Sequence, residues 1–99
     1  MTCKIEFPDF NLDVAIPESF IDISFRNDMC PIFEDKKAGL QLMIDYKDVD
    51  LREFEEGPRF ILQVIQSDIF KPFKSILETD TFEEVLSAIE THRHFLGTE

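Results

Sequence analysis

Two strand-like runs separated by an acidic connection constrain the fold of this chain most strongly. Apolar side chains alternate with polar or longer ones through residues 40–46, which is the period of two of a half-buried strand. Residues 60–65 carry apolar side chains on both faces, as central strands do. The connection, residues 47–58, is acidic and ends in Gly57-Pro58, whose turn chemistry stops it before the second run. We therefore expect both runs to be strands, the second of them central.

The same alternation predicts strands nearer the N-terminus. Residues 3–7 and 10–16 form two such strands, or one long strand bent at Pro8. A further run covers residues 21–26 and follows a turn at residues 17–19. These runs would extend the sheet ahead of the two anchor strands.

The segments around the anchor strands have weaker signals. Residues 27–33 mix turn formers with apolar side chains, so this stretch is either a site or a turn. Residues 34–39 are predicted to form a charged turn. Residues 72–78 alternate like a last edge strand, although a short helix that begins at Pro72 fits nearly as well.

One helix is predicted, from Thr81 to Phe95. Asp80 and Thr81 each precede a glutamate by three residues, which is the spacing of a capping box, and Gly97 is placed to close the helix. Apolar residues recur at steps of three and four and should face the sheet. They are Phe82, Val85, Leu86, Ile89 and Leu96.

Taken together, the elements predict an α+β fold in a single domain, residues 1–99. Its antiparallel, meander-like sheet has about five strands, and one C-terminal helix packs on one face. A single helix leaves part of such a sheet uncovered. Four phenylalanines have no certain place in the core: Phe10, Phe20, Phe25 and Phe54. We therefore expect an exposed face that meets a partner or a second copy of the chain.

Charge and cysteine content narrow the classes of function. The 99 residues hold 21 acids and 10 bases, and the formal charge of -11 repels nucleic acid and anionic membranes at long range. The N-terminus lacks the basic and apolar regions of a secretory signal, and the only cysteines are Cys3 and Cys30. We expect a cytoplasmic protein with reduced thiols, no direct contact with nucleic acid and no membrane association.

Nucleophile and metal candidates are weak. Cys30 is the first nucleophile candidate, and the alternative is a small buried hydrophobe, which free cysteines most often are. His92 and His94 point about 200° apart on a helix, so they cannot chelate one ion, and interaction with the helix dipole accounts for them. Isolated glycines form no phosphate-binding loop. We predict no catalytic residue, no metal and no cofactor, and hence not an enzyme.

The acidic connection is the remaining candidate site. Its Asp48-x-Asp50-x-Arg52 segment begins like a calcium loop, but arginine takes the third ligand position and Glu53 takes the place of the required glycine. A solvated loop is one interpretation, and a surface that docks on a basic partner is the other. The partner-binding candidates are Asp45, Asp48, Asp50, Glu53, Glu55 and Glu56.

Three hypotheses of function follow. The first is a small acidic interaction module of the inhibitor, immunity or adaptor type, which docks on a basic protein. In a sharper form its carboxylates imitate the phosphates of nucleic acid and block a DNA-binding protein. The second is a structural module that forms a homodimer through its uncovered face. The third is a thiol-dependent activity at Cys30.

Overall fold

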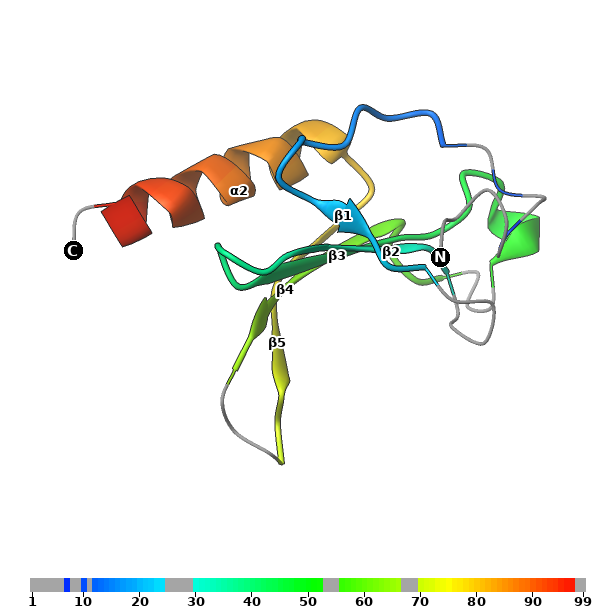
Figure 1. Cartoon of the computed structure of the whole chain (residues 1–99). Helices are drawn as coiled ribbons and strands as arrows, with labels where there is room; N and C mark the ends of the chain where they lie inside the picture. Colours follow the sequence, from blue (N-terminus) through cyan, green and yellow to red (C-terminus); the bar gives the residue numbers. More distant parts are fainter. Residues whose placement is uncertain are drawn as a thin grey trace.

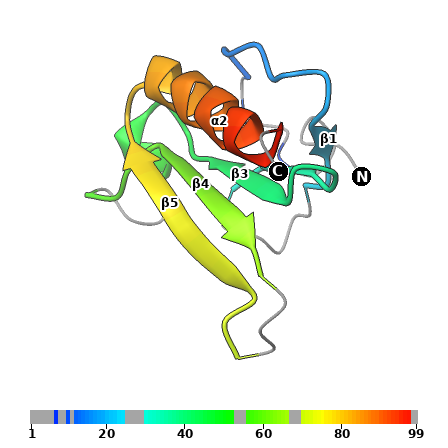
Figure 2. The same ribbon diagram turned by 90° about the vertical axis from the view of Figure 1, so that its left-hand side faces the viewer.

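The computed structural model of the chain describes residues 7, 10, 12–24, 30–52, 56–66 and 70–97, with the side chains of the helix described as far as His92. Each strand of its antiparallel sheet pairs with the next one along the chain, and the helix lies across one face (Figures 1 and 2). The elements are β1 (Ile21–Asp22), β2 (Ile32–Asp35), β3 (Leu40–Ile44), β4 (Phe60–Ile65), β5 (Phe73–Thr79) and α2 (Phe82–Gly97). The α+β meander with one C-terminal helix is confirmed.

The core lies between α2 and the sheet. The alternation of β3 and β4 places one set of side chains on the helix side, where Leu42 lies opposite Leu62 and Ile44 opposite Phe60. Burying each large apolar side chain contributes about 1.5–3 kcal/mol. The buried core comprises Phe20, Phe33, Leu40, Leu42, Ile44, Phe60, Leu62, Val85 and Ile89.

β4 is a central strand, as its sequence predicted. It lies between β3 and β5. On the face away from α2, Met43 lies opposite Ile61, and both are half-buried. Next to them the side-chain amide of Gln63 donates to the side-chain oxygen Oε1 of Gln41 at 2.7 Å. Both faces of β4 are therefore occupied, one by the core and the other by a mixed polar and apolar layer.

The predicted strand at residues 10–16 is wrong where the structure describes it. Residues 12–17 join no ladder, and the backbone bends at Val14. Val14 and Ile16 pack against the core. The apolar alternation of this segment therefore reflects packing on the core and not pairing with a strand. Of the predicted strand at residues 3–7, only Phe7 lies within the described residues, and it is buried.

Two of the four phenylalanines without a predicted place belong to the core region. Phe20 is buried in the core, and Phe10 packs against it with its ring edge-on to Tyr46 at 5.2 Å between centroids. They do not form an exposed face, which corrects that expectation. Phe25 and Phe54 lie outside the described residues.

The first two strands differ from the prediction in length and place. β1 ends at Asp22 because the Ser24 hydroxyl takes the next ladder position, where it accepts the amide of Ile32 at 3.1 Å. β2 covers residues that were predicted to be an irregular stretch and a charged turn. Its acidic end is buried, since the Asp35 carboxylate accepts the Ala38 amide at 3.1 Å in the turn. That turn closes at Gly39, whose φ of 69° favours glycine.

The last two elements settle the open alternative at residues 72–78. β5 is an edge strand and not a helix. At the start of α2 the Thr79 hydroxyl group makes two hydrogen bonds. It accepts the Thr81 amide at 3.1 Å and donates to the Glu84 carboxylate at 2.6 Å. Leu86, predicted to face the sheet, is 40% exposed, because it lies one residue past Val85 on the helix.

No helix in the described part of the chain is long and apolar enough to span a membrane.

Candidate functional site

The predicted partner-binding carboxylates do not share one environment. Asp45 is 6% exposed, and its carboxylate accepts the amide of Tyr46 at 2.8 Å, so the expectation that the whole acidic connection is exposed fails at this residue. The reason is that it continues β3: its amide donates to the Arg59 carbonyl at 2.7 Å. Asp48, Asp50 and Glu56 are exposed. Glu53 and Glu55 lie outside the described residues.

A single turn of 3₁₀ helix, η1 (Val49–Leu51), shapes the exposed part of the connection. Asp48 caps it by accepting the amide of Asp50 at 3.0 Å, and the Leu51 amide donates to the Asp48 carbonyl at 3.1 Å. This conformation turns two aliphatic side chains outward: Val49 is 47% exposed and Leu51 is 54% exposed. Carboxylates and aliphatic groups therefore alternate on one small surface.

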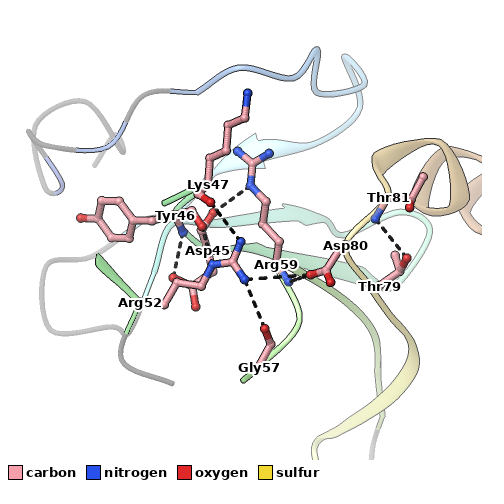
Figure 3. A network of polar contacts seen from close by, with 9 residues as sticks. All are labelled: Asp45, Tyr46, Lys47, Arg52, Gly57, Arg59, Thr79, Asp80 and Thr81. Carbon is pink, nitrogen blue, oxygen red and sulfur yellow. Dashed lines mark hydrogen bonds and ion pairs between the residues drawn. The ribbon is translucent and has the colours of Figure 1, made fainter. Parts of the chain in front are cut away.

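The Arg52 side chain donates hydrogen bonds to backbone carbonyls at both ends of the connection (Figure 3). Its guanidinium group donates to the carbonyl of Gly57 at 3.3 Å and to that of Lys47 at 3.3 Å. Its Nε donates to the carbonyl of Tyr46 at 2.5 Å. The side chain is only 8% exposed and lies 4.0 Å from the Asp80 carboxylate. One planar fork thus joins residues at the start and at the end of the loop.

Arg59 anchors the base of the connection to the rest of the domain (Figure 3). Its Nε donates to the carbonyl of Asp45 at 3.2 Å, and its guanidinium group lies 4.9 Å from the ring centroid of Phe60. Both terminal nitrogens bind the two carboxylate oxygens of Asp13, forming an ion pair. Its amide donates to the Asp80 carboxylate at 2.9 Å. The N-terminal segment, the end of β3 and the β5–α2 junction therefore meet at one arginine.

The ion pair shifts the titration of its carboxylate. The hydrogen bond from Arg59 holds the pKa of the Asp13 carboxyl below its usual value, and the positive charge of Arg59 acts in the same direction. Partial burial opposes this lowering of the pKa. Because the pKa is lower in the folded state than in the unfolded state, ionised Asp13 stabilises the fold at neutral pH.

Asp13→Asn should therefore destabilise the protein in a pH-dependent way. The difference in free energy of unfolding between wild type and variant should be steady near neutrality and shrink below about pH 4, as the wild-type carboxylate becomes protonated. Urea unfolding followed by circular dichroism at several pH values measures it. The control repeats the comparison in an Arg59→Met background, where the pH dependence should shrink, because Arg59 supplies the largest cause of the lowered pKa. The same pH dependence without Arg59 would contradict the assignment.

The other sequence candidates lie apart from this loop. Cys30 is 1% exposed, which favours its interpretation as a buried hydrophobe over a nucleophile. The His92 ring contacts the carbonyl oxygen of Ala38 at 3.1 Å and ties α2 to the β2–β3 turn. Cys3 and the side chain of His94 lie outside what the structure describes.

The calcium-like segment forms no ligand cluster in the described part of the chain. Within it, no group of three or more histidine, cysteine or acidic side chains could hold a metal ion. The residue at the third ligand position, Arg52, points inward onto backbone carbonyls.

Comparison with family models, curated proteins and solved structures finds no match for this chain. The exposure of Val49 and Leu51 and the structural contacts of Arg52 and Arg59 were not predicted from the sequence. The signal for the arginines was their position as isolated cations, one inside the acidic connection and one directly after Gly57-Pro58.

Proposed function

We propose that this protein is a non-catalytic interaction module that docks on a basic partner protein. The surface used, called the docking face below, comprises Asp48, Val49, Asp50, Leu51 and Glu56. The observation that carries the proposal is that Val49 and Leu51 are exposed next to Asp48 and Asp50, on a loop whose two ends are joined by the Arg52 side chain. Exposed aliphatic groups on a fixed loop are suited to contact, because little conformational entropy is lost when they bind.

Charge and apolar contact have separate roles in this proposal. The net charge of -11 and the carboxylates of the docking face attract a basic surface and orient it, which chiefly raises the association rate. Val49 and Leu51 then supply the apolar anchors on which affinity depends. The intervening aliphatic side chains favour a protein partner over the sharper hypothesis of phosphate imitation, since a nucleic-acid mimic needs a continuous row of charge.

The experiment compares partners captured by the immobilised protein and by two sets of variants. Asp50→Lys with Glu56→Lys reverses charge on the docking face, and Glu18→Lys with Glu90→Lys makes the same charge change at exposed sites elsewhere. Lysates of the source organism are passed over each, eluted along a salt gradient and quantified by mass spectrometry. Basic proteins that the wild type and the control pair retain, and the loop pair loses at least tenfold, support the proposal.

A third variant tests the apolar anchors. Val49→Ser with Leu51→Ser keeps the charge and should also weaken capture, by about tenfold for each 1.4 kcal/mol of lost contact. Its affinity should fall at every salt concentration, while the dependence of affinity on salt stays that of the wild type because the charges are unchanged. Capture that is equal for the wild type and all three variants would overturn the assignment of the docking face.

A further inference from the structure

The outer end of the β4–β5 hairpin extends past the layer that α2 covers (Figures 1 and 2). The register of the two strands shifts after Leu62, which leaves Ile76 as an extra residue on β5. A bulge of this kind bends and twists the strand that carries it. We call residues 70–76 the arm. Its apolar side chains are poorly covered, since Phe70 is 88% exposed and Phe73 is 43% exposed.

A groove lies beside the arm, between β5 and α2. It holds about 620 Å³ and is open to solvent. Ile76 and Leu77 form its wall on β5, and Ala88 and Glu84 contribute to its wall on α2. Figure 2 shows α2 crossing the sheet at an angle above β5. An exposed apolar projection and an open, mainly apolar groove are thus neighbours on one chain.

The two features carry opposite charge. Lys71 and Lys74 are exposed on the arm. At the other end of β5, the first turn of α2 carries the exposed Glu83 and Glu84, the latter on the wall of the groove. In a chain with 21 acids and 10 bases, two lysines on an apolar projection form a local reversal of sign. The arm is therefore complementary in charge to the groove.

In a dimer with a two-fold axis, the arm of each copy could contact the groove of the other copy at the same time. When two copies of β5 run antiparallel, the arm of each copy lies beside the start of α2 of the other. A self-complementary surface of this kind is what an isologous dimer requires. We propose that two copies of the chain associate in this way, with Phe70 entering the partner groove and Lys71 and Lys74 facing Glu83 and Glu84 of the partner.

The contact uses side chains and does not extend the sheet. β5 is an edge strand, but its bulge at Ile76 and the charge of Lys74 are devices that oppose strand addition. Two chains of charge -11 repel each other, but in physiological salt this repulsion is largely screened between charges more than about 8 Å apart. Ion pairs within the contact lie inside that range. The proposed dimer does not involve the docking face, so each proposal can fail without the other.

A charge exchange tests the pairing. The arm variant carries Lys71→Glu with Lys74→Glu, and the groove variant carries Glu83→Lys with Glu84→Lys. In either variant alone, both contacts of a dimer bring like charges together, whereas a mixed dimer of the two variants has opposite charges at both contacts. Sedimentation equilibrium should show a dimer for the wild type, at least tenfold weaker association for each variant alone, and restored association in an equimolar mixture.

The outcomes divide cleanly. Restored association in the mixture supports the proposal and also shows that both variants fold. A wild-type protein that stays monomeric at every accessible concentration overturns it, and so does a dimer that neither variant weakens, since that dimer uses another surface.

A measurement on the wild type alone guards against a variant that fails to fold. Zero-length cross-linking of amines to carboxylates is performed on a mixture of light and heavy isotope-labelled protein. Mixed-isotope peptides that join Lys71 or Lys74 of one copy to Glu83 or Glu84 of the other are expected. Their absence, with cross-links elsewhere detected, counts against the arm-in-groove contact.

Discussion

Leu62→Ala should lower the free energy of unfolding by about 3 kcal/mol, because the side chain is fully buried and its loss leaves a cavity. Leu62 lies on the central strand, opposite Leu42 on β3 and Leu77 on β5. The total free energy of unfolding of a chain of this size is roughly 5–15 kcal/mol, so this loss is a large part of it. The melting temperature should fall by about 10–20 °C. Urea and thermal unfolding followed by circular dichroism measure both quantities.

The matched control is Leu86→Ala, the same substitution on α2. Leu86 is 40% exposed, and alanine has the higher helix propensity, so stability should change by less than about 0.5 kcal/mol. The apolar stripe in the sequence placed this residue in the core, and the structure does not. Losses of equal size at the two positions would return Leu86 to the buried face and contradict the packing of α2.

Arg52→Ala should open the acidic loop. Three backbone carbonyls lose their donor, and hydrogen bonds from a charged group contribute about 1.5–3 kcal/mol each before water replaces them. Because the loop can turn toward solvent, we expect a net loss of about 1–3 kcal/mol in stability. Hydrogen exchange at the amides of Asp50 and Leu51 should accelerate more than exchange in β3. Both amides donate to Asp48, which directly follows Lys47, and Arg52 binds the Lys47 carbonyl.

Arg52→Lys distinguishes the fork from the charge. Lysine keeps the positive charge but presents it as a point, so it cannot reach the carbonyls at both ends of the loop, and exchange should stay fast. Lys47→Ala removes an exposed cation from the same loop and should leave exchange and stability near wild type. Slow exchange in the lysine variant would show that charge alone orders the loop.

The elements with strong periodicity could be predicted from the sequence. β3, β4 and α2 follow their apolar patterns because each buries one face against the others, so local preference and tertiary packing agree. β2 was missed because it has only four residues and ends in Glu34-Asp35, which resembles a turn. The segment at residues 12–17 was over-interpreted because apolar alternation arises wherever a chain lies on a core, with or without a ladder.

The candidate site could be predicted only in outline. The position of the acidic loop follows from the strands on either side of it. The burial of Asp45 does not, because it depends on a backbone bond to Arg59, fourteen residues away. Nor could the outward position of Val49 and Leu51 be anticipated, since apolar residues in a short loop usually turn inward. Contacts between segments decide both features.

The order of the strands has a consequence for how this chain acquires its structure. Every strand pairs with its sequence neighbour, so no strand of the described sheet waits for a distant partner; the connections range from residues 36–39 between β2 and β3 to residues 45–59 between β3 and β4. Local pairing of this kind favours rapid folding for a sheet protein. The apolar face of those hairpins stays open until α2 packs against it. Docking of α2 is thus the step that covers this apolar face and lowers the risk of aggregation.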